Sequence, residues 1–222
     1  MEYLLTIIAF LLTITAQIFV NGSYNKTRKI KNKHNLTGEQ VARAILDKND
    51  LRNVQIEEVG TTLGDHYDPR TKTIRLSSDI YHNTSIASVS VAAHECGHAI
   101  QDKEDYAFLR IRHALIPLVS FSSYAGYLAI VIGCIFASMN LIWFGILLEI
   151  IILLFQLITL PVEFNASSRA LKNIEELNLL EQSEIKYSRK MLKAAAMTYV
   201  ASVAATILEI LRLILIFGRR DD

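Results

Sequence analysis

Four long apolar stretches constrain what this chain can fold into. They cover residues 3–20, 114–137, 141–160 and 194–217. Each is close to the roughly 20 residues that a helix needs to cross the hydrocarbon core of a bilayer. A chain of 222 residues has no core large enough to bury four such helices. The sequence therefore predicts a mostly α integral membrane protein with about four transmembrane helices.

The distribution of positive charge predicts how these helices are oriented. The first apolar stretch has no basic residues before it and no clear signal-peptide cleavage site, so we expect an uncleaved anchor. A basic cluster follows it, at Lys26, Arg28, Lys29, Lys31 and Lys33. By the positive-inside rule, this cluster and the basic segment 163–193 face the cytoplasm, and residues 218–222 lie outside.

This topology predicts a multi-pass protein of the plasma membrane, with the lipid bilayer as a partner. The expected parts are an anchor (1–22), a cytoplasmic α+β part (23–113), a transmembrane hairpin (114–161), a cytoplasmic helix (162–193) and a last transmembrane helix (194–218). The net charge of +1 gives no reason to expect a nucleic acid partner. The two cysteines, Cys96 and Cys134, form no plausible structural disulfide, which agrees with a cytoplasmic catalytic side.

A short motif, His94-Glu95-Cys96-Gly97-His98, indicates the chemistry of the cytoplasmic part. On a helix, positions i and i+4 share one face, so His94 and His98 can bind one metal ion. Glu95 then lies beside the open coordination position, where it can accept a proton from the attacking water. This is the arrangement of zinc hydrolases. The alternative is a buried helix that carries two histidines by chance, and Cys96 is expected to be a small buried residue.

The segments around this motif predict a small α+β zincin-like domain. Thr37 and Gln40 form a capping box for a helix that ends near residue 49. Residues 54–59 and 71–76 are expected to be strands, residues 65–70 a turn-bearing loop, and residues 85–102 the metal helix. Residues 73–76 are the candidate edge strand for holding extended substrate, although an ordinary strand of a small sheet is an equal alternative.

A catalytic zinc usually has three protein ligands, so a third ligand is needed. Residues that could supply the third ligand atom are His66, His82, Asp102, His113 and the acids after the third apolar stretch. Glu163 is preferred because it follows Pro161, where the apolar stretch reaches the membrane surface and proline can occupy a helix's first turn. The alternative is a glutamate at a helix start, favoured there by the helix dipole.

Five segments in order along the chain resemble the YugP-like family of membrane-bound neutral zinc metallopeptidases. They are residues 36–38, 65–70, 92–101, 160–167 and 194–201. The resemblance implies a gluzincin-type site with Zn²⁺ and with Glu163 as the third ligand. The chain is also similar to the CAAX prenyl endopeptidases, in which a membrane hairpin separates the two-histidine helix from the ligand glutamate. Asn165 stands where many relatives have aspartate, which leaves Asn165 or Ser167 to orient a zinc histidine.

The expected function is a zinc-dependent endopeptidase that cleaves peptides or membrane proteins near the cytoplasmic membrane surface. Glu95 would take a proton from water and deliver it to the leaving amine. His66 and Tyr67 are the candidate oxyanion donors, with Arg169 as another. The alternatives are a zinc hydrolase of a non-peptide amide or lipid, and a non-catalytic zinc-binding scaffold. The sequence gives no oligomeric state.

Overall fold

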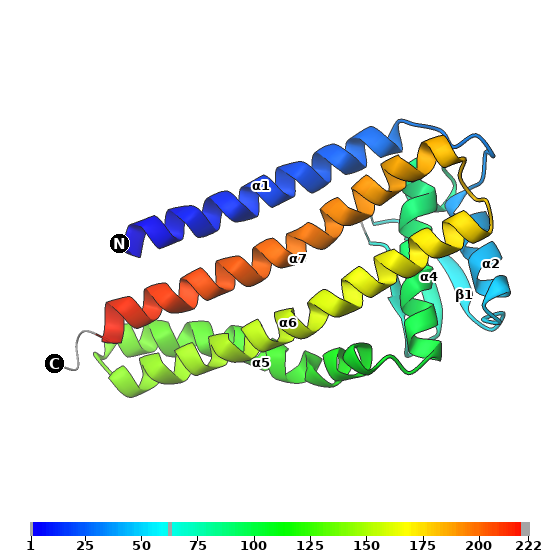
Figure 1. Cartoon of the computed structure of the whole chain (residues 1–222). Helices are drawn as coiled ribbons and strands as arrows, with labels where there is room; N and C mark the ends of the chain where they lie inside the picture. The colour runs from blue at the N-terminus through cyan, green and yellow to red at the C-terminus, as the bar shows by residue number, and fades with distance from the viewer. Residues whose placement is uncertain (1, 62–63, 219–222) are drawn as a thin grey trace. The chain divides into compact units, whose positions relative to one another are not determined.

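The computed structural model describes residues 2–61 and 64–218, so residues 219–222, expected outside the membrane, lie outside the described part. The chain is mostly helical, with one small sheet (Figure 1). The elements are α1 (Glu2–Arg28), α2 (Gly38–Lys48), β1 (Gln55–Val59), β2 (His66–Asp68), β3 (Thr73–Ser77), α3 (Ser78–Tyr81), α4 (Ile86–Lys103), α5 (Ala107–Ile135), α6 (Met139–Glu176) and α7 (Gln182–Phe217).

Two compact units form within the described residues. The first contains α1 up to Gln17, the segment Arg110–Pro161, and α7 from Met197 onward. The second contains Ile18–Leu109 and Val162–Ala196, and therefore the sheet, α2 and α4. Four of the described helices, α1, α5, α6 and α7, have residues in both units.

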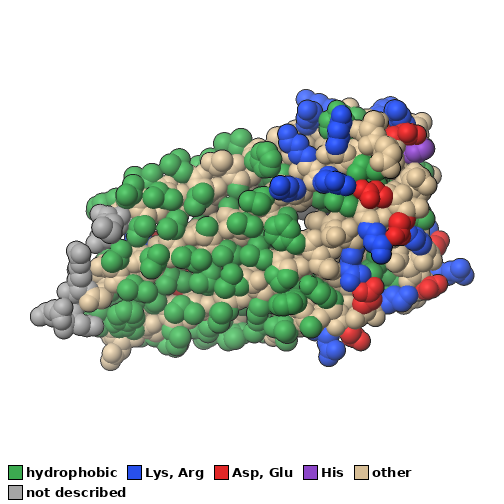
Figure 2. All heavy atoms as spheres, in the orientation of Figure 1, with side chains coloured by type: hydrophobic (Ala, Val, Ile, Leu, Met, Phe, Trp, Pro, Cys, Tyr) green, Lys and Arg blue, Asp and Glu red, His purple; other side chains and the backbone are tan. Residues whose placement is uncertain are grey.

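The four apolar stretches form helices as predicted: α1, α5, α6 and α7 are each long and apolar enough to span a bilayer. The most apolar 18-residue window of α1 is 0% buried, and those of the other three helices are at most 22% buried. On the face that Figure 2 shows, hydrophobic side chains predominate on the first unit, whereas charged side chains gather on the second. An apolar surface this extensive is stable in lipid and not in water.

The second unit has a three-stranded sheet with the order β1-β3-β2. Strand β3 pairs parallel with β1 and antiparallel with β2. The expectation that residues 65–70 form only a loop is therefore wrong, because His66–Asp68 is a strand. The expectation that residues 73–76 lie at a sheet edge is wrong as well, because β3 is the central strand. Alternating polarity indicates a half-buried strand but does not reveal how many neighbours it has.

Helix α2 begins with the predicted capping box. The Thr37 side chain accepts a hydrogen bond from the Gln40 backbone N–H, and the Gln40 side chain accepts one from the Thr37 backbone. The apolar face of α2, with Val41 and Ile45, is fully buried against the core that α4 and the sheet share. The packing of α2 in this core thus holds α4 in position.

Helix α4 begins after Ser85, whose side chain accepts a hydrogen bond from the Ser88 backbone N–H. Its small residues Ala92, Ala93 and Ala99 are fully buried. Cys96 is buried as predicted, and its thiol donates to the Ala42 carbonyl oxygen at 3.6 Å. Burial raises the pKa of this thiol, so it stays protonated and packs as a small apolar side chain.

Helix α6 passes through Pro161 without ending, contrary to the expectation that proline starts a new helix there. A proline inside a helix lowers the stability of that helix by about 3 kcal/mol. The tertiary packing of the other turns of a long helix can outweigh that loss. Glu163 therefore lies in the interior of a 38-residue helix. Because the helix dipole acts only at the first and last turns, it does not explain why a glutamate occupies this position.

The close approach of α4 and α6 depends on Gly97. A Cβ atom at this position would lie 2.5 Å from the carbonyl oxygen of Ala166 on α6. Contacts this short do not occur, so any larger side chain would push the two helices apart. The absence of a side chain at Gly97 thus sets the spacing between α4 and this part of α6.

Replacing Gly97 with alanine is expected to destabilise the protein by about 1–3 kcal/mol, because backbone must move to admit the methyl group. The melting temperature of the full chain in detergent measures this. The control is Gly22→Ala, also inside a helix, where an added Cβ meets nothing within 4 Å. The control should leave the melting temperature unchanged or slightly higher. Equal melting temperatures for Gly97→Ala and the wild type would contradict the steric role of Gly97.

Candidate metal centre

Two histidines project from one face of α4. His94 and His98 are one helical turn apart, and their ring centroids lie 4.8 Å apart with the ring planes at 86°. Both side chains are largely buried, with exposed fractions of 16% and 12%. The i, i+4 spacing therefore brings the two imidazoles together as the sequence predicted.

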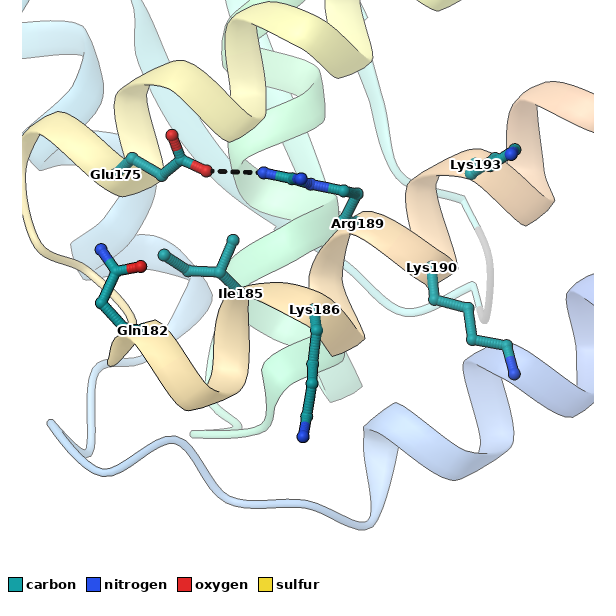
Figure 3. A pocket seen from close by; sticks show the side chains of 7 residues that line it. All are labelled: Glu175, Gln182, Ile185, Lys186, Arg189, Lys190 and Lys193. Carbon is teal, nitrogen blue, oxygen red and sulfur yellow. Dashed lines mark hydrogen bonds and ion pairs between the residues drawn. The ribbon is translucent and has the colours of Figure 1, made fainter.

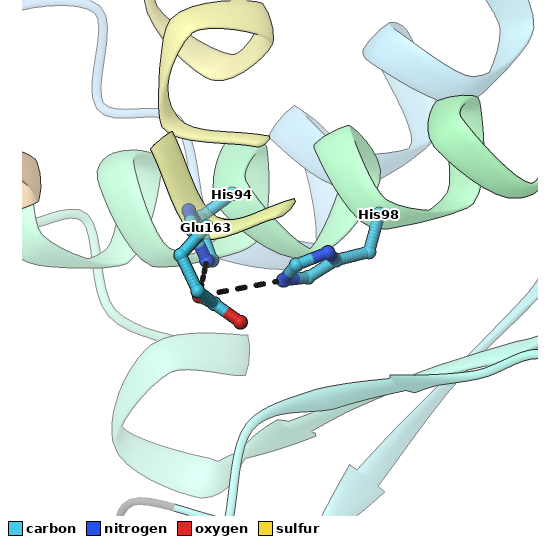
Figure 4. Close-up of side chains that lie close together, drawn as sticks. All are labelled: His94, His98 and Glu163. Carbon is cyan, nitrogen blue, oxygen red and sulfur yellow. Dashed lines mark ion pairs between the residues drawn. The ribbon is translucent and has the colours of Figure 1, made fainter. Parts of the chain in front are cut away.

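Glu163 reaches this pair from α6 (Figure 4). Its Oε2 atom lies 3.3 Å from His94 Nε2 and 3.8 Å from His98 Nε2. The three ligand atoms all lie within 4.8 Å of one another. Glu163 is only 4% exposed, so its carboxylate has little access to water. The charge of a buried carboxylate has to be compensated, either by protonated imidazoles or by a cation.

The geometry of this group fits a zinc ion. Tetrahedral coordination with bonds of about 2.0–2.2 Å places neighbouring ligand atoms roughly 3.4 Å apart. The two distances from Glu163 Oε2 to the histidine Nε2 atoms bracket that value. They are also longer than the usual 2.7–3.2 Å of a direct N–H···O hydrogen bond. Two imidazoles and one carboxylate are a donor set of catalytic zinc sites, which keep the fourth position open.

Hydrogen bonds orient both imidazole rings. His98 Nδ1–H donates to Gln101 Oε1 at 3.0 Å, and the Gln101 amide donates to the Val162 carbonyl at 2.8 Å and to Asn165 Oδ1 at 3.0 Å. Because the Gln101 NH₂ group is used in this way, its oxygen faces His98. The proton of His98 is therefore on Nδ1, which makes Nε2, the nitrogen that faces Glu163, the one that can bind a cation.

Gln101 is the residue that sequence reasoning missed. It is fully buried and connects His98 on α4 with the turn of α6 that carries Glu163. Its position three residues after His98, on the same helix face, was the available signal. Of the two residues expected to orient a zinc histidine, Ser167 contacts one, with its Oγ 3.2 Å from His94 Nδ1. Asn165 contacts Gln101 and Arg169 instead.

Glu95 lies next to His94 and is 8% exposed. Burial raises the pKa of its carboxyl to about 7; the charge of His94 opposes the rise, and the negative charge of Glu163 adds to it. A hydrogen bond from the Tyr67 backbone also favours the carboxylate. A carboxyl group whose pKa is close to neutral can both accept and release a proton at physiological pH.

The side chains of the two candidate oxyanion donors have other partners. The Tyr67 hydroxyl donates to Asp102 Oδ2 at 2.6 Å, and burial raises the pKa of Tyr67 further above its usual range. The His66 ring is exposed, with Nδ1 2.7 Å from the Gly64 carbonyl oxygen. Arg169 donates to Glu104 and to Asn165, both at 2.6 Å. Each of these three side chains thus has a hydrogen-bond partner outside the group of His94, His98 and Glu163.

Most other candidates for the third ligand are engaged elsewhere. His82 lies 3.0 Å from Glu58, and Asp102 holds Tyr67 and Lys72. His66 faces Gly64, and His113 belongs to α5, in the first unit. Glu163 is the candidate that the structure places against both histidines.

Two comparisons with known proteins agree with this geometry. The family model described as "Putative neutral zinc metallopeptidase" matches residues 2–218. The chain is 44% identical over 219 residues to the "Putative membrane protease YugP" of Bacillus subtilis (strain 168), covering 98% of this chain and 97% of that protein. No solved structure matched the chain. The family match and the full-length similarity agree with a His-His-Glu group that could hold Zn²⁺, and the chain belongs to the neutral zinc metallopeptidase family.

Proposed function

We propose that this protein is a membrane-embedded zinc endopeptidase that hydrolyses peptide bonds near the cytoplasmic surface of the plasma membrane. His94, His98 and Glu163 would hold the zinc ion. The observation that carries the proposal is the convergence of these three ligand atoms beside the buried carboxyl of Glu95. A purely structural zinc site is closed by four protein ligands and needs no acid–base group beside it, so Glu95 favours an enzyme over a scaffold.

Zinc bound here would polarise the substrate carbonyl and make water more acidic. Glu95 supplies the proton transfer: its carboxylate accepts a proton from the attacking water and returns it to the leaving amine. The enclosure that raises the pKa of Glu95 also keeps bulk water from competing for that proton. For the oxyanion, His66 remains our candidate side chain, and Tyr67 could serve only after giving up its bond to Asp102.

An extended substrate would pair with strand β2. It forms one edge of the sheet and packs against α4, which carries His94 and Glu95. Extended peptides bind exposed sheet edges through main-chain hydrogen bonds. This assigns to β2 the role that sequence analysis gave to residues 73–76. Unfolded or juxtamembrane segments are the substrates that suit such a site.

Glu95→Gln is expected to retain zinc but to lower peptidase turnover by about 10²–10⁴-fold, because the amide cannot accept the proton. The measurement is cleavage of fluorescently labelled casein by the full chain in detergent, with zinc content determined on the same samples. Glu39→Gln, on the first turn of α2, is the control and should behave like the wild type.

Normal turnover in Glu95→Gln would exclude Glu95 as the base. A wild-type protein that holds zinc but cleaves no peptide, yet hydrolyses a lipid or another amide in a Glu95-dependent way, would favour the non-peptide hydrolase. Zinc bound without any hydrolysis would favour the scaffold.

The cytoplasmic orientation is tested by thiol labelling in intact cells. In a Cys134→Ala background, the remaining Cys96 is buried and unreactive. Ser183→Cys, in the first turn of α7, should be protected from a membrane-impermeant maleimide, whereas Asn140→Cys, in the first turn of α6, should react. The reverse labelling pattern would place the metal centre on the outer side.

A further inference from the structure

A groove lies where the end of α1 runs alongside the beginning of α7. It has a volume of about 240 Å³ and is lined among others by Ile18, Phe19, Gly22, Lys26, Tyr187 and Lys190; these six define the lysine groove. Thr27 on α1 contacts Met191 on α7 at 3.0 Å, which ties the two helices together beside it. All of these residues belong to the second unit. The groove is separate from the metal centre, none of whose residues line it.

The two ends of the lysine groove differ in chemistry. Ile18 and Phe19 are exposed apolar side chains in a helix whose apolar window is entirely unburied. Lys26 follows Ile18 by eight residues, about 12 Å further along α1. On α7, Lys190 lies just before the apolar stretch that begins at residue 194. The groove therefore passes from an apolar to a cationic surface. At this level both helices change from an apolar sequence to a sequence with charged residues.

Positive charge gathers at the cationic end without a balancing acid. Lys26 and Lys186 lie 5.7 and 5.2 Å from the centre of the Tyr187 ring, and Lys190 lies 6.0 Å from that of Phe19. Figure 3 shows Arg189 directed to Glu175, at 3.0 Å, whereas Lys186 and Lys190 extend away from that acid. Within residues 2–61 and 64–218, no carboxylate lies within 4.0 Å of Lys26, Lys186 or Lys190.

We propose that the lysine groove binds an anionic phospholipid. The phosphate would lie between Lys26 and Lys190, beside the phenol ring of Tyr187. An acyl chain would lie along Ile18 and Phe19. Clustered ammonium groups repel one another, and a phosphate relieves that repulsion. Basic pockets at the membrane-facing ends of helices bind anionic headgroups for this reason. The apolar half distinguishes a lipid from a free phosphate ion, which would gain nothing from Ile18 and Phe19.

The test is native mass spectrometry of the full chain released from detergent, titrated with phosphatidylglycerol or with phosphatidylcholine of the same chain length. The wild type should bind one phosphatidylglycerol in preference to phosphatidylcholine. The double variant Lys26→Gln/Lys190→Gln should weaken phosphatidylglycerol binding about tenfold or more, given roughly 1 kcal/mol for each lysine near the surface.

The matched control is Lys29→Gln/Lys33→Gln, which removes two exposed charges from the same basic segment but outside the groove. It should change binding by less than about twofold. Equal losses in the two double variants would show diffuse attraction and overturn the proposal, as would equal binding of the two lipids. Displacement of the lipid by inorganic phosphate or by an acidic peptide at equal concentration would overturn it too. Since no readout depends on peptidase activity, the result is independent of the proposed function.

Discussion

The packing of α4 against α6 is the interaction on which the candidate metal centre depends. One helix supplies two imidazoles and the other a carboxylate, so a small shift between them would separate the ligand atoms. Gly97 permits the backbones to approach, and the buried Gln101 amide joins His98 to the turn that carries Glu163. The burial that the core imposes on α4 also raises the pKa of Glu95. Steric fit, hydrogen bonding and desolvation thus act on the same few residues.

Features that depend on local spacing were predictable from the sequence. The capping box at Thr37, the shared face of His94 and His98, and the burial of Cys96 each follow from the geometry of one helix. Glu163 was preferred for its place after Pro161, but only family resemblance favoured it over a helix-start glutamate, because spacing within one helix does not show which distant acid returns to the histidines. The structure places it there.

Features that depend on long-range packing were missed. The position of β3 between two partners is set by pairing with residues before and after it, which alternating polarity does not encode. Pro161 was expected to begin a helix, yet the helix continues through it because the packing of neighbouring turns outweighs the local cost. Gln101 was overlooked because an amide becomes informative only when its partners are known. The lysine groove, too, exists only where α1 and α7 lie side by side.

X-ray absorption at the zinc edge of the full chain loaded with one equivalent of zinc tests the central claim most directly. Binding by His94, His98 and Glu163 predicts nitrogen and oxygen donors at about 2.0–2.2 Å, with outer scattering from two imidazoles and no sulfur at about 2.3 Å. Glu163→Ala should remove one oxygen donor or release the zinc. A sulfur shell, or a spectrum unchanged in Glu163→Ala, would contradict the assignment of Glu163 as the third ligand.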